Sequence, residues 1–264
     1  MIPIRDRRPS YRFSWITVSL IAINVIVFLF GLTLSSEPTL TVNITEWKDY
    51  GVLPLDYEKL GQSGITDVRI SPKRNFFFKY GAVPGEIANI KDFPPTVSFP
   101  ILFTLVTSTF LHGGLFHLLG NMLFLWIFGD NVEDAMGPVR FFVFYFLAGI
   151  AGAMLQIVAN SGSGTPMVGA SGAIAGVMAA YLLLYPNSKI VTLVPIFFFI
   201  TFIEIPAFIM VGLWFLFELI RAVGQPVGQV ARLAHVGGFI AGALMTPYFK
   251  KKYIKVRFWN YWFK

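Results

Sequence analysis

Six polar side chains are among those that lie in apolar stretches of this sequence, where partners for them are scarce. They are His112, His117, Asn121, Gln156, Ser171 and His235, and they include all three histidines of the chain. A polar group inside a membrane-spanning segment is costly to bury and is therefore a candidate for function. A serine hydroxyl beside an uncharged imidazole forms a nucleophile and its general base, which is the chemistry of acyl transfer.

Donors for a developing negative charge are expected near the serine. His117 and Asn121 are four residues apart, so on one helix they lie on the same face, one turn from each other. Ser171 stands at the start of a short apolar run that ends near Tyr185. The first turn of a helix presents free N–H groups and the positive end of the helix dipole, and both suit an oxyanion.

Two stripes of glycine could bring the serine and an imidazole together. His235, Gly238 and Gly242 follow one helical stripe at i, i+3 and i+7, and Gly172 and Gly176 form a GxxxG pair directly after the serine. Small residues let two helix backbones approach closely in a membrane. Packing of these stripes would put the serine hydroxyl within hydrogen-bond distance of the His235 ring. Helix packing without chemistry is the alternative role of each glycine.

The composition excludes an ordinary water-soluble enzyme. Of the 264 residues, 55% are hydrophobic, 17% aromatic and only 13% charged, whereas roughly 25% of the residues of a soluble domain are charged. Apolar runs near the roughly 20 residues that cross a bilayer indicate a polytopic helical membrane protein. The absence of cysteine excludes a disulfide framework and a cysteine nucleophile. The net charge of +7 is explained by basic flanks of the spans, so no nucleic-acid partner is expected.

The fold predicted from these runs is an all-α bundle of six transmembrane helices, with a long loop after the first. The spans cover residues 13–36, about 113–128, 141–159, 170–185, 206–220 and 231–249. A segment lying laterally is expected before the second span, up to about His112, and an interfacial loop is expected over residues 190–206. The fourth span, at about 15 residues and roughly 22 Å, is shorter than a hydrocarbon core of roughly 30 Å. Ser171 should therefore lie below the membrane surface, in a water-accessible recess lined by residues 160–169.

Basic residues at both ends of the chain predict its orientation. Residues 1–12 contain four arginines and residues 250–264 begin with a cluster of lysines, so the positive-inside rule places both termini in the cytoplasm. Residues 13–36 then form the first span, residues 37–98 an extracytoplasmic loop, and residues 99–249 the core of spans two to six. The expected location is the cell membrane. The basic tail could serve as a topology anchor or bind anionic lipid head groups.

Three separate motifs resemble those of the rhomboid family of intramembrane serine proteases. Residues 112–121 match HxxxxHxxxN, residues 169–172 match GxSG and residues 234–238 match AHxxG. Residues 131–134, with Gly137 and Arg140, are similar to the family's loop between spans two and three. The resemblance covers residues 104–244, and the order and spacing of the motifs fit the family.

The resemblance implies an endopeptidase that cleaves transmembrane protein substrates near the outer side of the membrane. It implies Ser171 as the nucleophile and His235 as the general base. The oxyanion would be held by the Ser171 N–H and the side chains of His117 and Asn121. This chemistry is a dyad that needs no carboxylate, and neither the fourth nor the sixth predicted span contains Asp or Glu. No cofactor and no metal are implied.

Two positions depart from the family pattern. The aromatic residue often found one turn after the nucleophile is replaced by Ala175, so another group must hold His235. Phe103 and Thr104 occupy the place of a common tryptophan-arginine pair. Neither change removes a reacting group, so both concern the tuning of the site and the conformation of its loops.

The main alternative is a rhomboid-like protein that binds transmembrane clients without cleaving them. Loss of Ser171 or His235 would favour that alternative, and both residues are present. A metal site is disfavoured because His112 and His117 are five residues apart and diverge on one helix. His112 is expected to shape the loop before the second span rather than to react.

Overall fold

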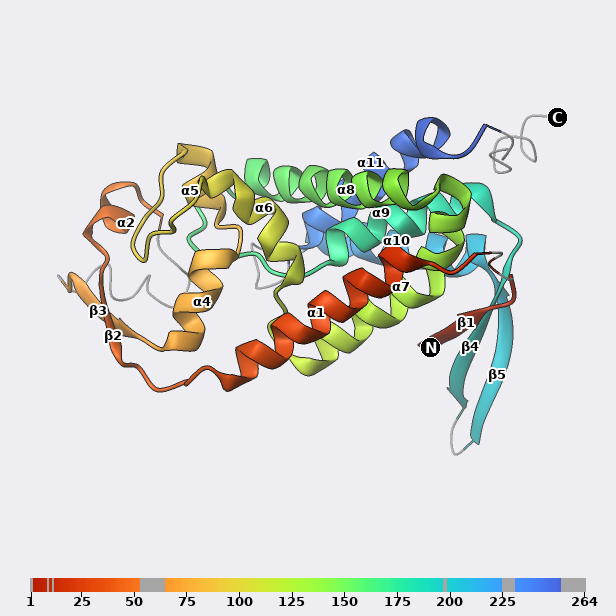
Figure 1. The fold of residues 1–264 in the computed structure, drawn as a ribbon, viewed down its shortest axis with the longest axis horizontal. Coiled ribbons are helices and arrows are strands. Elements are labelled where there is room, and N and C mark those ends of the chain that lie inside the picture. Colours follow the sequence, from red (N-terminus) through yellow and green to blue (C-terminus); the bar gives the residue numbers. More distant parts are fainter. Residues whose placement is uncertain are drawn as a thin grey trace.

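Long helices pack side by side in the centre of the molecule, with a small sheet at one end and a second folded unit at the other (Figure 1). The computed structural model describes residues 2–8, 10, 12–52, 65–196, 199–224 and 231–252. The main helices are α1 (Trp15–Thr33), α7 (Leu115–Met136), α8 (Pro138–Ala159), α9 (Ser171–Leu184), α10 (Ala207–Gly224) and α11 (Arg232–Phe249). The predicted apolar spans thus form helices, most of them with ends close to the predicted ones.

By length and apolar composition, three of the described helices could cross a membrane, namely α1, α7 and α8. α9 is shorter, with 14 residues. The expected lateral segment consists of three short helical turns, η2 (Ile101–Phe103), α6 (Thr104–Thr107) and η3 (Ser108–Phe110). The chain is therefore a mostly helical protein with apolar helices suited to a membrane, and the count of six spans stays a prediction.

α7, the helix of the second predicted span, ends at Met136, beyond the predicted end near residue 128. α7 includes residues 131–134, which the sequence resemblance assigns to a connecting loop. Glu133 gives a reason, because its buried carboxylate accepts hydrogen bonds from the N–H groups of Ile16 (3.0 Å) and Thr17 (2.8 Å) in the first turn of α1. Free N–H groups at a helix start are natural partners of an anion. The chain then turns at Gly137, whose φ of +86° favours glycine.

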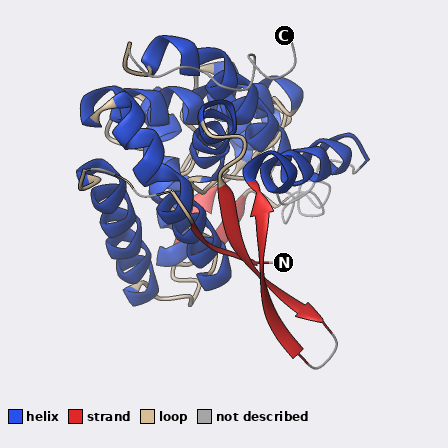
Figure 2. Cartoon of the chain, turned by 90° about the vertical axis from the view of Figure 1, so that its right-hand side faces the viewer, coloured by secondary structure: helices blue, strands red, loops and turns tan. Residues whose placement is uncertain are grey.

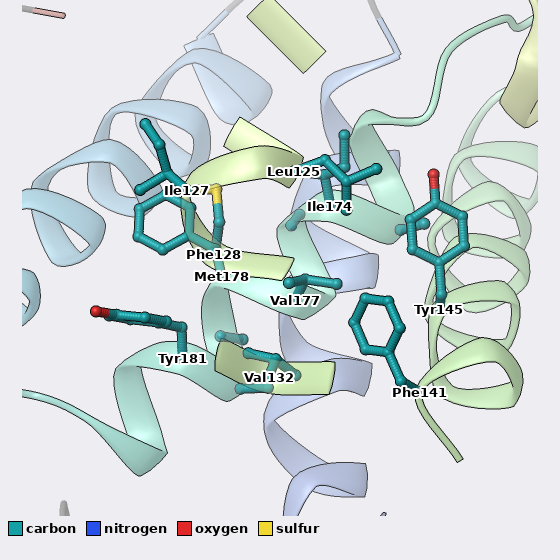
Figure 3. Close-up of a cluster of buried hydrophobic side chains, with 14 of the residues drawn as sticks. Leu125, Ile127, Phe128, Val132, Phe141, Tyr145, Ile174, Val177, Met178 and Tyr181 are labelled. Carbon is teal, nitrogen blue, oxygen red and sulfur yellow. The ribbon is translucent and has the colours of Figure 1, made fainter. Parts of the chain in front are cut away.

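α9 is the central helix of the bundle and contacts α7, α8, α10 and α11. Its residues are buried except Ser171, Leu182 and Leu183, which are half-buried. In Figure 3, aromatic and aliphatic side chains of α7 and α8 gather around those of α9. Alanine and glycine make up much of α9, so its neighbours approach its backbone from several sides. Packing against these neighbours therefore determines the position of α9. Because Ser171 is the first residue of α9, the same packing determines where Ser171 lies.

Residues 189–196 and 199–206 form two antiparallel strands instead of the expected interfacial loop. Its strands are β4 (Lys189–Ile196) and β5 (Phe199–Pro206), and β1 (Ile2–Asp6) pairs with β4 on the other side. The sheet, of order β1-β4-β5, projects from the helices (Figure 2). Its many β-branched residues favour strands. The expectation of an all-α fold is corrected accordingly, because two small sheets accompany the helical bundle.

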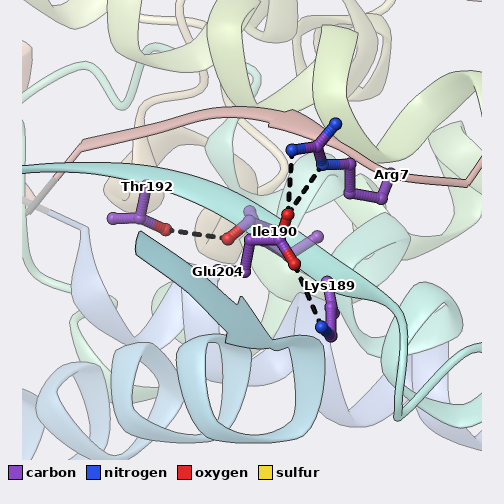
Figure 4. Close-up of polar contacts among 5 residues, drawn as sticks. All are labelled: Arg7, Lys189, Ile190, Thr192 and Glu204. Atoms are coloured by element: carbon purple, nitrogen blue, oxygen red, sulfur yellow. Dashed lines mark hydrogen bonds and ion pairs between the residues drawn. The ribbon is translucent and has the colours of Figure 1, made fainter. Parts of the chain in front are cut away.

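Polar contacts fasten this sheet internally and to the bundle. Glu204 of β5 accepts a hydrogen bond (2.9 Å) from Arg7, which follows β1, and its carboxylate lies 3.1 Å from the amine of Lys189, the first residue of β4 (Figure 4). One carboxylate therefore contacts residues from all three parts of the sheet. Asp6 of β1 accepts a hydrogen bond from the Tyr181 hydroxyl of α9 (2.7 Å). Burial raises the pKa of Asp6 to about 6. The amino-terminal strand is thus tied to the central helix.

Residues 37–98, expected as a loop, contain a folded unit. Its elements are β2 (Leu40–Asn43), α2 (Thr45–Asp49), β3 (Asp67–Ile70), α4 (Pro72–Tyr80) and α5 (Pro84–Asn89), and β2 pairs with β3. Aromatic and aliphatic residues give this 37–98 unit a hydrophobic core of its own. The core consists of Ile44, Trp47, Val52, Val68, Ile70, Phe78, Val83 and Phe93.

Three main-chain hydrogen bonds join the 37–98 unit to the loop between α8 and α9. Ala82 and Met167 exchange two of them, with N–H to carbonyl distances of 3.1 and 2.8 Å. The third runs from the N–H of Gly85 to the carbonyl of Ser163, at 2.9 Å. The unit therefore reaches the loop that leads into Ser171.

Glu86 makes the stability of the 37–98 unit depend on pH. It is buried in α5, and burial together with the Asp92 carboxylate raises its pKa from 4.5 to about 8, although its carboxylate accepts a hydrogen bond from the Phe93 N–H. Between these two pH values the folded unit holds a proton that the unfolded chain has lost. The free energy of unfolding of the unit therefore falls as the pH rises through this window.

Glu86→Gln removes the titrating group and keeps its size. We expect the variant to be more stable than wild type at about pH 8 and to lose the slope between about pH 5 and pH 8. Hydrogen exchange of peptides from residues 84–93, corrected for intrinsic rates, measures the local opening free energy at both values. Glu46→Gln, at an exposed position of the same unit, is the control and should keep the slope. The same slope in wild type and Glu86→Gln would contradict this account.

Candidate active site

A cavity of about 560 Å³ lies at the amino-terminal end of α9. Four predicted site residues, Ser171, His235, His117 and Asn121, are among the residues that line it, and so is Gln156. The lining also includes residues of α10 and of the loop before α9. Polar groups surrounded by apolar helices make a pocket in which water and a peptide backbone could be held.

The turn before Ser171 depends on a glycine. Gly169 has a φ of +125°, and its N–H donates to the Ser108 carbonyl (2.9 Å). A Cβ atom at Gly169 would lie 2.8 Å from Cε1 of His117, closer than real Cβ contacts allow. Glycine therefore lets the chain pass the His117 ring and begin α9 at Ser171, where backbone N–H groups lack partners within the helix.

α9 and α11 approach each other backbone to backbone. A Cβ atom built at Gly238 would overlap the Gly172 carbonyl group, and one at Gly242 would lie 2.5 Å from the Gly176 carbonyl oxygen. Both positions therefore need glycine. The contact predicted between the two glycine stripes is present, and it sets the distance between the elements that carry Ser171 and His235.

The Ser171 hydroxyl and the His235 ring are in hydrogen-bond contact, with Oγ 2.7 Å from Nε2. The other ring nitrogen, Nδ1, lies 2.8 Å from Oε2 of Glu218 on α10. The expected dyad needed no carboxylate, and a carboxylate nevertheless contacts His235. That expectation considered acidic residues only in the fourth and sixth spans, whereas Glu218 lies in the fifth. The sequence could have indicated Glu218, because a carboxylate inside an apolar span is itself a candidate for function.

A tryptophan also contacts the His235 ring. Trp214, one turn before Glu218 on α10, has its ring centroid 6.1 Å from that of His235, with the two planes at 32°. Ala175, one of the two positions noted above as departing from the family pattern, is fully buried. The aromatic contact to His235 is made from α10, and sequence spacing within α9 could not reveal it.

His117 and Asn121 both lie on α7 and line the cavity. The amide nitrogen of Asn121 is 3.0 Å from Nε2 of His112, and the rings of His112 and His117 are 5.1 Å apart between centroids. An asparagine amide has two N–H groups, so one remains for a ligand when the other is bound by His112. His112 is buried beside these two residues, and its structural role stays a prediction.

Gln156 has a partner of its own, because its side-chain oxygen accepts a hydrogen bond from the N–H of Leu233 (3.0 Å). That contact fastens α8 to the start of α11. In the described part of the chain, no three His, Cys, Asp or Glu side chains are grouped so as to hold a metal ion. The described lining of the cavity offers hydroxyl, imidazole, amide and carboxylate groups.

Comparisons with known proteins all indicate the same family. A family model described as the Rhomboid domain matches residues 101–252, more than half of the chain. Rhomboid protein 1, mitochondrial, of Saccharomyces cerevisiae is 30% identical over 164 residues, which are 58% of this chain and 44% of that protein. RHOMBOID-like protein 5 of Arabidopsis thaliana is 31% identical over 138 residues, or 52% of this chain and 41% of the relative.

One similar relative is named as inactive. Inactive RHOMBOID-like protein 8 of Arabidopsis thaliana is 38% identical over 101 residues, 36% of this chain and 28% of its own length. This chain therefore spans less than half the length of these curated relatives. The family includes both active and inactive members, so membership alone does not assign an activity.

Gly238→Ala should separate Ser171 from His235, because the added methyl group needs the space of the Gly172 backbone. Overpacking costs about 1–3 kcal/mol, and a misplacement of about 1 Å can lower the rate of a site about 100-fold. We expect a lower Tm in detergent and slower modification of Ser171 by a fluorophosphonate, followed by mass spectrometry.

Gly212→Ala on α10 is the matched control, since no described atom lies within 4 Å of its added Cβ. The control should keep both the Tm and the modification rate of wild type. A wild-type modification rate in Gly238→Ala would show that the site does not depend on the backbone contact between α9 and α11.

Proposed function

This chain belongs to the rhomboid family, and on that premise we propose that it is an intramembrane serine endopeptidase. It would hydrolyse peptide bonds in or near the transmembrane segments of other membrane proteins. The observation that carries the proposal is the 2.7 Å contact between Ser171 Oγ and His235 Nε2 at a polar cavity. A nucleophile within hydrogen-bond reach of its base is the arrangement that acyl transfer requires.

In the proposed reaction, Ser171 Oγ attacks the carbonyl carbon of the substrate while its proton passes to Nε2 of His235. The negative charge that forms on the carbonyl oxygen would be held by the Ser171 N–H and by the side chains of His117 and Asn121. The imidazolium then gives its proton to the leaving amine, and the C–N bond breaks. Water, deprotonated by the same imidazole, hydrolyses the acyl-enzyme and restores the serine.

The cavity gives a physical reason for a preference among substrates. A peptide bond in an intact helix is shielded by the hydrogen bonds of the helix and by its neighbouring turns. When the helix unwinds, its backbone N–H and C=O groups find no water in the hydrocarbon core to bind them. A substrate segment that unwinds readily, with small residues at the bond to be cut, would therefore be favoured. The polar groups around Ser171 would form hydrogen bonds with the substrate backbone groups that unwinding exposes.

The proposed location is the cell membrane, with both termini in the cytoplasm and the cavity open to the opposite side. Support comes from the basic residues at both ends of the sequence. The 37–98 unit, which carries both signs of charge, joins the loop at the cavity end of α9. The yeast relative is named as mitochondrial, so another membrane with the same sidedness of charge is the alternative.

The second candidate function is the binding of transmembrane clients without cleavage. One similar relative is named inactive, which is the observation in its favour. The paired hydroxyl and imidazole favour the protease, because a binding protein has no need of a nucleophile held against a base.

Ser171→Ala and His235→Ala should each lower cleavage of a transmembrane substrate about 1,000-fold or more, because each removes a reacting group. The assay compares the purified variants with wild type in liposomes, using a substrate whose transmembrane segment contains small, helix-breaking residues. Ser35→Ala, at an exposed position, is the control and should cleave like wild type.

Equal cleavage by wild type and both variants would reject the proposal. A fluorophosphonate that labels Ser171 in wild type, and fails to label it in His235→Ala, would distinguish a protease from an inert binder even before a substrate is found. Wild type that neither labels nor cleaves would favour the binding protein.

A further inference from the structure

Glu218 is the one carboxylic acid among the described residues that line the cavity. The His235 ring lies between it and the serine, with Nδ1 2.8 Å from the Glu218 carboxylate and Nε2 2.7 Å from the Ser171 hydroxyl. We infer that Glu218 is a positioning residue, which holds His235 in the tautomer and orientation that accept the Ser171 proton. This inference rests on the proposed protease function and turns its expected dyad into a three-residue chain.

The tautomer follows from the chemistry of the two partners. An ionised carboxylate can only accept hydrogen bonds, so its contact with Nδ1 puts the ring proton on that nitrogen. An uncharged imidazole with its proton on Nδ1 has a free lone pair on Nε2, where the Ser171 hydroxyl can donate. The carboxylate also stabilises the imidazolium that forms when the serine proton has been transferred.

The surroundings suit a carboxylate with this role. The side chains of Glu218 and His235 are 13% and 14% exposed, so the pair is largely shielded and still borders the cavity. Arg221 lies three residues after Glu218 on α10, and Arg232 lies three residues before His235 on α11. Each arginine is about one helical turn from a member of the pair. An acidic group in an apolar helix is tolerated where it has a polar partner, which for Glu218 is the His235 ring.

α10 supplies a second contact to the same ring. Trp214 and Glu218 are four residues apart, so both lie on the face of α10 that meets α11. Trp214 limits the tilt of the imidazole through its ring contact, and Glu218 limits its rotation through the hydrogen bond. A purely structural role, in which Glu218 only joins α10 to α11, is the alternative that the experiment must separate.

Glu218→Gln keeps the size of the side chain and removes its charge. In the liposome assay we expect kcat to fall at least about 100-fold while KM stays within about twofold, by analogy with the loss of up to about 10⁴-fold when the acid of a serine-protease triad becomes an amide. Glu218→Asp, which keeps the charge, should recover part of the rate. Glu37→Gln removes an exposed carboxylate that follows α1 and should cleave like wild type.

Wild-type kcat in Glu218→Gln would overturn the inference and leave the proposed protease function intact. An absence of Ser171-dependent cleavage in wild type would overturn both. The modification rate of Ser171 by a fluorophosphonate gives an independent readout, and it should fall in parallel with kcat. A fall in Tm alone, with the modification rate of the folded fraction unchanged, would assign Glu218 a structural role and overturn the inference.

A variant cycle tests whether Glu218 acts through the imidazole. In the His235→Ala background, Glu218→Gln should cause no further loss in the residual modification rate of Ser171, because the group it orients is gone. An equal loss in both backgrounds would overturn the inference.

Nitrogen NMR tests the tautomer in the unaltered protein. The chain has three histidines, so imidazole ¹⁵N signals can be assigned with single variants. We expect His235 to carry its proton on Nδ1 in wild type and to lose this preference in Glu218→Gln. A proton on Nε2 of His235 in folded wild type would overturn the inference without any variant.

Discussion

Glycine at four positions lets α9 and α11 pack with their backbones in contact, and the geometry of the cavity follows from that distance. A bilayer supplies no hydrophobic force between helices, so close van der Waals packing has to hold them together. The same small residues leave α9 enclosed by its neighbours on most sides. Its first residue, Ser171, is half-buried and lines the cavity, so the hydroxyl is partly shielded by the bundle and still faces the cavity.

Three buried or half-buried carboxylates each accept a hydrogen bond from, or lie in contact with, a specific donor in another part of the chain. Glu133 meets the first N–H groups of α1, Asp6 meets the hydroxyl of Tyr181, and Glu218 meets the imidazole of His235. An unpaired charge would be far too costly among apolar helices. These pairs therefore specify which helices and strands lie next to each other, while apolar packing supplies most of the contact area.

Motif spacing predicted the residues that meet at the cavity, because helical periodicity relates residues three, four or seven apart on one element. The contact of Glu218 with His235 joins two helices and has no fixed spacing, so the sequence analysis missed it. The strand pair of β4 and β5 was missed because a short apolar run is compatible with either a strand or a membrane-embedded loop. The core of the 37–98 unit was hidden by the many polar residues around Trp47 and Phe78.

The joint between the 37–98 unit and the loop before α9 has a mechanical consequence. Main-chain hydrogen bonds at Ala82 and Gly85 connect the unit to a stretch that ends at Met167, four residues before Ser171. These hydrogen bonds couple the position of the unit to that of the loop. A molecule that binds the unit and displaces it would therefore also displace the turn before Ser171.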